Sequence, residues 1–316
     1  MTLALVTMSH SPLLEYVDPP ADVKAAVEAA FDQVRSFVHE YDPDLVINIG
    51  PDHYNGFFYD IMPPFCIGYE AVGVGDFGTQ AGPLDVDTDT ARALTEYLME
   101  HGIDMTVSLR MEVDHGAVQP MEIIYGDFTA KPVLPIFINS VAPPFAPLKR
   151  IRQLGELIGR FASTELADKK VLLIGSGGLS HEPPVPQIAT ATPEVREALL
   201  GGGRHLTPEA RDARQQRVIN AARDFAAGIN VVKPLAPEWD RELMRILASG
   251  DLTPLDAWSP DWMSEVAGNS SHEVRTWIAA YAALGAVGDY TVDYSFYKPI
   301  PEYIAGFGVT IATLNA

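Results

Sequence analysis

The chain has 316 residues, of which 47% are apolar, enough to bury one large hydrophobic core or two modest ones. Its 22 basic and 42 acidic residues give a formal net charge of −20, which repels nucleic-acid phosphates and anionic membrane surfaces. We therefore expect neither nucleic acid nor membrane among its partners.

The cysteine content and the N-terminal residues indicate the cellular compartment of the protein. Cys66 is the only cysteine, so an intrachain disulfide and a thiolate metal cluster are both excluded. The apolar start of the chain has no basic segment and no cleavage site of a signal peptide. No apolar run approaches the roughly 20 residues that span a bilayer. We expect a soluble, cytoplasmic protein.

The first half of the chain alternates predicted strands with predicted helices. Leu3–Met8 and Asp44–Ile49 are short apolar runs of the kind found in strands buried on both faces. Pro20–Tyr41 and Thr88–His101 have apolar residues at helical spacing, and the second ends at Gly102. The glycine-rich and aromatic stretch His53–Gly82 is predicted to be a long ordered loop that could wall a pocket for a flat ring.

The second half continues with strands and then becomes mostly helical. Val133–Asn139, Lys170–Ile174 and Gly306–Leu314 are further predicted strands. Between Thr207 and Ala286 the sequence predicts a helical layer packed on the sheet, with helices at Thr207-Pro208-Glu209, Trp239–Ser249 and His272–Leu284. The aromatic stretch Tyr290–Tyr303 is predicted to be a second long loop.

This order of elements predicts the fold class. Strands that alternate with helices indicate an α/β fold, with a central mostly parallel or mixed sheet and helices on both faces. A strand returns after the helical stretch, so we expect the helices to belong to the same unit. Residues 1–316 are therefore predicted to form a single catalytic domain.

Three of the eight histidines follow the ends of predicted strands. These are His10, His53 and His181. Ligands of open α/β sheets bind at the carboxyl ends of strands, so these side chains could converge on one site. His115 lies in a short turn-like segment beside Gly116. The spacing alone is not diagnostic, because each histidine taken singly could be a hydrogen-bonded structural residue.

Two other chemistries have weaker support in the same region. Gly175–Gly178 could cradle a phosphate, but it lacks the Gly-Lys-Ser/Thr ending of a phosphate-binding loop. Ser176 and Ser180 could be nucleophiles, yet neither lies in a G-x-S-x-G elbow. A tight turn that presents Ser180 and His181 is the preferred interpretation.

Five segments of the chain form a recognisable set. They are Ser9-His10-Ser11-Pro12-Leu13, Pro51-Asp52-His53-Tyr54-Asn55-Gly56, Val113-Asp114-His115-Gly116, Gly175-Ser176-Gly177-Gly178-Leu179-Ser180-His181 and Ser271-His272-Glu273-Val274-Arg275-Thr276-Trp277. Together these segments resemble the class III extradiol ring-cleavage dioxygenases, and the likeness extends over nearly the whole chain.

The resemblance implies a metal site and two proton-transfer groups. His10, His53 and Glu273 would hold Fe²⁺ as a facial triad, which leaves three positions open for both catecholate oxygens and O₂. His181 would take the substrate proton, and His115 would be the acid, although these roles could be exchanged. Glu273 would not be chosen from the sequence alone, because a helical glutamate is usually solvated. Asp114 could orient His115 or cap a turn.

The resemblance also implies a reaction and a substrate class. A catechol would be opened next to its diol with both atoms of O₂, as in aromatic catabolism. The expected substrate is 3-(2,3-dihydroxyphenyl)propionate or its cinnamate analogue, and the carboxylate could be met by Arg217, Arg275 or Lys298. A homo-oligomer is expected from the family. One alternative is an extradiol dioxygenase for a different catechol, and another is a zinc-dependent hydrolase on the same two-histidine, one-carboxylate site. A third is a non-catalytic subunit of the same fold. The presence of all five candidate residues, the three metal ligands and the two proton-transfer histidines, argues against that third alternative.

Overall fold

One mixed sheet of eight strands lies at the centre of the computed structural model, which describes residues 2–229 and 232–315. Its spatial order is β10-β11-β1-β9-β2-β8-β3-β6. The bounds are β1 Thr2–Met8, β2 Leu45–Gly50, β3 Phe65–Gly68, β6 Thr106–Ser108, β8 Val133–Ile138, β9 Lys170–Ser176, β10 Tyr290–Ile300 and β11 Ala305–Leu314. The four adjacent strands β1, β9, β2 and β8 are parallel, whereas β11 and β3 pair antiparallel with β1 and β8. The predicted mixed sheet is confirmed.

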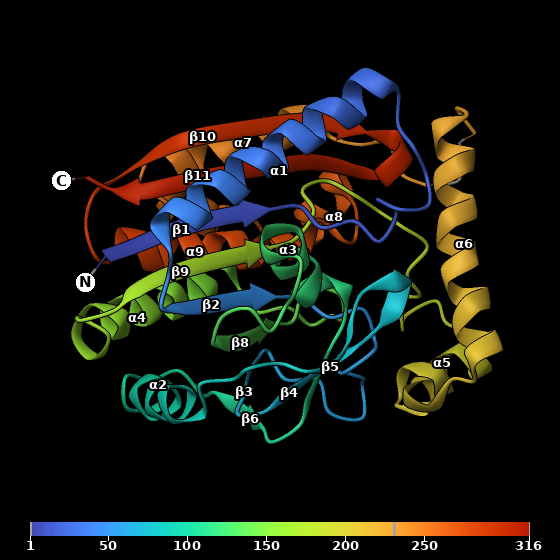
Figure 1. Ribbon diagram of the computed structural model, residues 1–316. Coiled ribbons are helices and arrows are strands. Elements are labelled where there is room, and N and C mark those ends of the chain that lie inside the picture. Colours follow the sequence, from blue (N-terminus) through green and yellow to red (C-terminus); the bar gives the residue numbers. More distant parts are fainter. Residues whose placement is uncertain (1, 230–231, 316) are drawn as a thin grey trace.

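Helices cover both faces of this sheet, as the buried strands require (Figure 1). Alternate residues of β1 join different hydrophobic cores: Leu3 and Leu5 pack with α4 and α9, and Ala4 and Val6 pack with α1 and α3. The helices are α1 Ala21–Tyr41, α2 Thr88–Glu100, α3 His115–Tyr125, α4 Leu148–Glu165, α5 Pro193–Leu199, α6 Pro208–Ala226, α7 Pro237–Ala248, α8 Pro260–Ala267 and α9 Val274–Gly285. Among the described residues, no helix combines the length and the apolar character needed to cross a membrane.

Two glycines let α4 lie directly against α9. A Cβ atom on Gly155 would come within 2.1 Å of the Ala279 carbonyl oxygen, and one on Gly159 within 2.0 Å of the Ala283 carbonyl oxygen. Backbones at this separation leave no room for a side chain. The close contact fixes α9, and with it the residues that precede α9 in the chain.

The helical stretch differs from the prediction in the position of α6. Figure 1 places α5 and α6 beyond the carboxyl ends of the strands, not on a face of the sheet. The reason is composition, because only Ile219 and Ala222 of α6 are buried, too few to cover a sheet, whereas nearly every residue of α9 is buried. Within the predicted helical layer, α9 therefore packs on the sheet and α6 lies beyond its end.

Neither predicted long loop is free of strands. His53–Gly82 contains β3 and two strands of a small sheet, which is ordered β5-β4-β7 with bounds β4 Ala71–Val74, β5 Ala81–Pro83 and β7 Met111–Val113. Tyr290–Tyr303 is mostly β10, an edge strand in which apolar residues alternate with polar ones. That alternation was present in the sequence, but the aromatic and proline content concealed it.

Candidate metal centre

The predicted convergence of histidines at strand ends is confirmed. Strands β1 and β2 lie on either side of β9 and are parallel to it, so their carboxyl ends form one edge. His10 follows β1, His53 follows β2 and His181 follows β9. All three side chains are buried. The sheet therefore brings together residues that lie far apart in the sequence.

Hydrogen bonds around His10 fix which of its ring nitrogens faces the centre. Ser176 donates its single hydroxyl proton to the Gly116 carbonyl oxygen at 2.5 Å. The His10 Nδ1 atom, 3.0 Å from the same hydroxyl, must therefore be the donor. This leaves an unprotonated Nε2, which lies 3.4 Å from a carboxylate oxygen of Glu273. Burial lowers the pKa of His10 to about 3, against the opposing effect of Glu273, so the ring is neutral.

Asp114 holds His53 in an equivalent way. One carboxylate oxygen of Asp114 accepts from the His53 backbone N–H at 2.8 Å and from Nδ1 at 3.1 Å. The other oxygen accepts from the Gly116 N–H at 2.9 Å, so Asp114 is also the N-cap of α3. Burial opposes the charge of His53, but the carboxylates of Asp114 and Glu273 outweigh it and raise the pKa of His53 well above its usual value.

The third ring, His181, repeats this arrangement with a neutral partner. Its Nδ1 donates to the Leu179 carbonyl oxygen at 3.0 Å, and its Nε2 lies 3.1 Å from Glu273 Oε1. His53 Nε2 lies at the same distance from that oxygen. Burial disfavours the charged ring, but the Glu273 carboxylate outweighs burial and raises the pKa of His181.

Glu273 is the centre of this arrangement and has no exposed surface. It precedes the first residue of α9, and its second carboxylate oxygen accepts from the Gly178 N–H at 3.0 Å. Burial would raise the pKa of Glu273, yet the neighbouring imidazoles, His181 first, hold it well below the usual value. The residue that the sequence alone would have assigned to the solvent is thus a buried anion.

The donor set suits a metal cation. Three Nε2 atoms face one carboxylate, while each Nδ1 atom is committed to another acceptor. His10 is neutral, so its Nε2 lone pair and the Glu273 oxygen, 3.4 Å apart, repel one another unless a cation lies between them. Two imidazole nitrogens and one carboxylate are common ligands of divalent iron or zinc.

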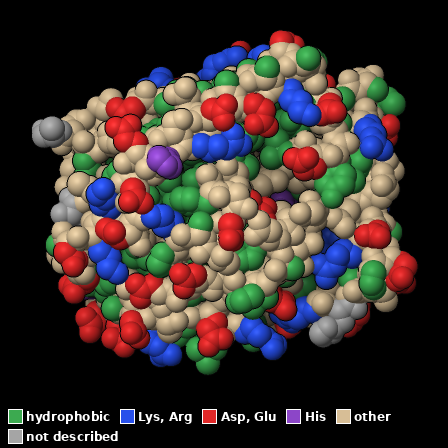
Figure 2. Space-filling view, in the orientation of Figure 1, with side chains coloured by type: hydrophobic (Ala, Val, Ile, Leu, Met, Phe, Trp, Pro, Cys, Tyr) green, Lys and Arg blue, Asp and Glu red, His purple; other side chains and the backbone are tan. Residues whose placement is uncertain are grey.

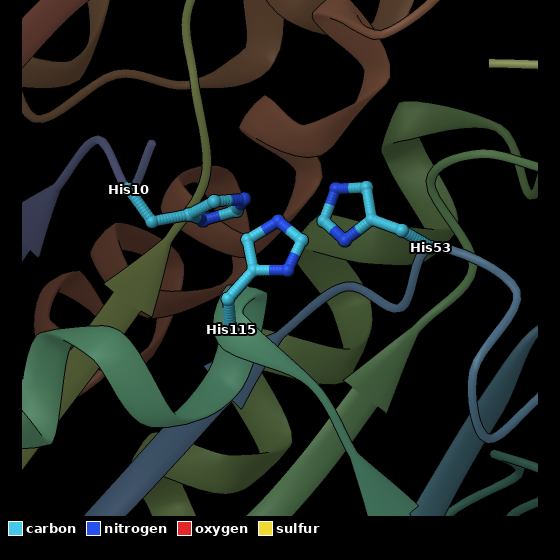
Figure 3. A group of neighbouring side chains, drawn as sticks. All are labelled: His10, His53 and His115. Carbon is cyan, nitrogen blue, oxygen red and sulfur yellow. The ribbon is translucent and has the colours of Figure 1, made fainter. Parts of the chain in front are cut away.

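His115 lies beside His10 and His53 (Figure 3). One ring nitrogen from each of His10, His53 and His115 lies within 4.8 Å of the others, and the three rings point toward a common space. The ring centres of His53 and His115 are 4.5 Å apart and nearly parallel. His115 is the first residue of α3, not part of a free turn as the sequence suggested.

The partner of His115 is Asp76, which sequence reasoning missed. Asp76 Oδ2 lies 2.5 Å from Nδ1 of His115, and Oδ1 accepts from the His115 backbone N–H at 2.8 Å. Of the two roles considered for Asp114, capping is therefore the one observed, and orientation of His115 falls to Asp76. The sequence offered one signal, an acid in the tight turn between Gly75 and Gly78, both with positive φ.

A cavity of about 760 Å³ opens beside the histidines. Figure 2 shows the hollow, in which a histidine side chain is visible. His10, His53, His115 and His181 line its inner end, and much of the remaining wall is apolar. A cavity of this size and character is typical of small-molecule sites.

Comparison with known proteins identifies relatives over the full length. The family model described as "Catalytic LigB subunit of aromatic ring-opening dioxygenase" matches residues 4–308. A 2,3-dihydroxyphenylpropionate/2,3-dihydroxicinnamic acid 1,2-dioxygenase of Rhodococcus globerulus is 58% identical over 315 residues, which cover 100% of this chain and 99% of the relative. Proteins of the same name from Rhodococcus jostii (strain RHA1) and Mycolicibacterium smegmatis are 54% and 52% identical, over 99% of this chain and 98% and 99% of their own lengths.

A solved structure shares the fold. The crystal structure of an uncharacterized protein from Escherichia coli K12 matches with a TM-score of 0.51, covering 97% of this chain and 98% of that chain. The sequence identity is 11%, so this similarity concerns the fold alone.

Proposed function

This chain belongs to the family of the catalytic LigB subunit of aromatic ring-opening dioxygenases, and from that premise we propose that it opens the ring of 3-(2,3-dihydroxyphenyl)propionate or its cinnamate analogue. Relatives that are 58% and 54% identical carry those two substrates in their names. The reaction inserts both atoms of O₂ next to the diol. The observation that carries the proposal is the buried Glu273 carboxylate surrounded by imidazole nitrogens at the inner end of a large cavity.

We assign ferrous iron to this centre, with His10, His53 and Glu273 as its ligands. A set of His10, His53 and His115 would bring no negative charge to a dication, whereas Glu273 supplies one in a place without solvent. Two imidazoles and one carboxylate on one side of iron leave positions for a substrate diol. When bound, ferrous iron supplies the Lewis acidity that favours the catecholate and the redox chemistry that activates O₂.

The other two histidines handle protons. His181 accepts a proton from the substrate hydroxyl at Nε2, since its Nδ1 is already committed to the Leu179 carbonyl. His115 donates a proton as the carbon ring opens. The Asp76 carboxylate against Nδ1 fixes the orientation of the His115 ring and leaves Nε2 as the nitrogen that donates the proton.

We also propose that residues 1–316 act as one cytoplasmic catalytic domain that assembles into a homo-oligomer. Support for a single functional unit comes from the cavity, whose lining draws on both halves of the chain, from His10 to Ala305. Exposed apolar side chains such as Trp262 and Ile61 would suit contacts between copies. Light scattering of the purified protein tests the assembly, and a monomer at micromolar concentration would contradict it.

Anaerobic substrate loading tests the reaction. Protein reconstituted with ferrous iron is incubated with 3-(2,3-dihydroxyphenyl)propionate without oxygen, and air is then admitted. We expect one iron per chain, uptake of one O₂ per substrate and a yellow ring-opened product. The same protein reconstituted with zinc should give no product, whereas hydrolysis by the zinc form with no ring opening by the iron form would overturn the proposal.

Histidine variants test the proton roles. His115→Gln and His181→Gln should bind iron normally and lower the turnover number by about 10² to 10⁴, the usual contribution of general acid–base catalysis. His39→Gln, an exposed histidine of α1, is the matched control and should keep wild-type turnover. Wild-type turnover in both site variants would show that these histidines do not transfer the protons.

A further inference from the structure

One side of the cavity beyond the histidines is formed by α6, and that side carries three arginines. Arg211, Arg214 and Arg217 all line the cavity. Residues three positions apart lie on one face of a helix, so the three guanidinium groups form a row, here called the arginine face. Arg214 is at its centre, with Arg211 and Arg217 on either side. Such a row is unexpected in a chain with a formal charge of −20.

Arg214 reaches across to the loop that carries His53. It donates to the carbonyl oxygens of His53 and, at 3.2 Å, Tyr54. These acceptors are neutral, and within the described residues Arg214 has no carboxylate in ion-pair contact. The side chain therefore fixes the backbone beside a proposed metal ligand, and we treat it as a positioning residue.

Arg211 and Arg217 are differently placed. Among residues 2–229 and 232–315, the structure gives neither guanidinium a hydrogen-bond or ion-pair partner, although both line the cavity. Figure 2 shows basic side chains bordering the hollow. Two cations that face a largely apolar cavity, in a protein that otherwise repels anions, point to an anionic group on the ligand.

Two other cations that the sequence suggested for this role lie elsewhere. Arg275 is fully buried and donates to the ring and the carbonyl oxygen of His272, and it is absent from the cavity lining. Lys298 lies 3.8 Å from Asp22 and is also absent from that lining. Of the three cations that the sequence suggested, only Arg217 lines the cavity.

We propose that Arg211 and Arg217 bind the side-chain carboxylate of the substrate, while Arg214 holds the loop at His53. This inference rests on the proposed function for the identity of the ring. With the diol at the histidine end, the side chain points away from Glu273 and toward α6. Guanidinium groups pair with carboxylates in a planar, two-bond geometry, so the pair selects catechols with an acidic tail.

Selectivity between two catechols tests the proposal. We measure kcat/KM for 3-(2,3-dihydroxyphenyl)propionate and for 3-methylcatechol, which lacks the carboxylate, in Arg211→Gln, Arg217→Gln and the double variant. The ratio of the two should fall about tenfold to a hundredfold in the double variant, through the propionate KM, because a charge-assisted hydrogen bond contributes that much. The kcat for 3-methylcatechol should stay at the wild-type value.

Arg223→Gln is the matched control. Arg223 is on the same helix and donates to the Tyr16 carbonyl oxygen at 3.5 Å, but it does not line the cavity. Its removal changes the net charge as much as either single variant does, so a loss of selectivity equal to that of the single variants would show a long-range field effect and overturn the proposal. Unchanged selectivity in the double variant would also overturn it.

A binding measurement separates this inference from the proposed function. Calorimetry with 3-phenylpropionate, which has the acidic tail and no diol, should show binding to the wild type and at least tenfold weaker binding to the double variant. That result without ring opening of any catechol would sustain the carboxylate site and refute the proposed reaction. Ring opening of both catechols with equal 3-phenylpropionate affinity in wild type and variant would do the reverse.

Discussion

Replacement of Asp76 by asparagine isolates the function of the acid that holds His115. In the wild type, one oxygen of Asp76 lies 2.5 Å from Nδ1 of His115 and the other accepts from the His115 backbone N–H at 2.8 Å. Both groups are buried. An asparagine has nearly the same shape and can keep the bond to the backbone, but it carries no charge and one side of it donates instead of accepting.

The size of the effect follows from that single contact. A buried hydrogen bond to a charged group contributes about 1.5–3 kcal/mol. If the contact stabilises the protonated His115 in the transition state, its loss lowers turnover by roughly 10- to 150-fold, since about 1.36 kcal/mol corresponds to a factor of ten. The cost should exceed this range if the neutral ring adopts the wrong tautomer, as the loss of the aspartate from a serine-protease triad illustrates.

The assay is steady-state ring opening of 3-(2,3-dihydroxyphenyl)propionate at saturating oxygen, together with iron content and the unfolding midpoint in urea. Asp76→Asn should lower kcat with little change in iron content, because among the described residues the Asp76 side chain hydrogen-bonds to His115 and Thr79 and to none of the proposed ligands. Asp127→Asn is the isosteric control and should behave as the wild type, because Asp127 is exposed and, in the described part of the chain, its carboxylate accepts only within its own turn, from Thr129. The double variant with His115→Gln should be no slower than His115→Gln alone.

Three outcomes would refute this reasoning. An undiminished kcat in Asp76→Asn would mean that His115 needs no charged partner and that the short contact is structural only. A loss of iron equal to the loss of activity would assign His115 and Asp76 to the metal centre instead. Additive losses in the double variant would show that Asp76 acts through some group other than His115.

Three further predictions concern the metal, the helix packing and the single thiol. Glu273→Gln should weaken Fe²⁺ binding by at least about 100-fold in anaerobic titration, because a neutral amide replaces the buried anion. The control Glu100→Gln, at an exposed residue, should bind Fe²⁺ as the wild type does. Equal Fe²⁺ affinities of Glu273→Gln and the wild type would exclude Glu273 as a ligand. In urea titrations, Gly159→Ala should lower the free energy of unfolding by about 3 kcal/mol or more, since its Cβ would lie 2.0 Å from the Ala283 carbonyl oxygen. The control Gly288→Ala, whose Cβ would have no neighbour nearer than 3.7 Å, should change this free energy little. Similar values for the two variants would contradict the close contact between α4 and α9. Burial raises the pKa of Cys66 to about 12, so the folded thiol stays protonated at pH 8 and should react with a thiol-specific disulfide reagent only after unfolding. Because the thiol of the unfolded chain ionises from about pH 9, this group should also make the free energy of unfolding fall as the pH rises above 9. Rapid reaction of the folded protein with the reagent would refute both expectations.

Local sequence patterns were enough to predict most of the core of the fold. β1 and α1 begin and end within a residue of the ranges expected from apolar runs and helical spacing. These signals succeed because strands buried on both faces and amphipathic helices are defined by their own residues. Composition failed where a segment had two interpretations, as in β10, where alternating tyrosine and phenylalanine residues also suited an aromatic loop.

The ends of the predicted strands likewise indicated which histidines meet, but not which carboxylate contacts His115. A parallel sheet aligns the ends of its strands, so His10, His53 and His181 could be expected to meet from their positions alone. Asp76 could not be expected, because it reaches His115 through the pairing of β4 with β7, strands of four and three residues that are too short to show a periodic pattern. The contact is set by register in a small sheet, which the sequence does not encode locally.

Glu273 shows why a buried charge is the hardest feature of such a site to infer. Its position before α9 is typical of a solvated acid, and only the packing of α9 against α4 and β9 carries it into the core. A lone buried carboxylate would be protonated or exposed by local rearrangement. It remains an anion because three imidazoles from separate elements converge on it, and those same imidazoles need an anion between them. The Glu273 carboxylate and the histidines therefore stabilise one another, and together they provide the charge and the donor atoms of a site for a divalent cation.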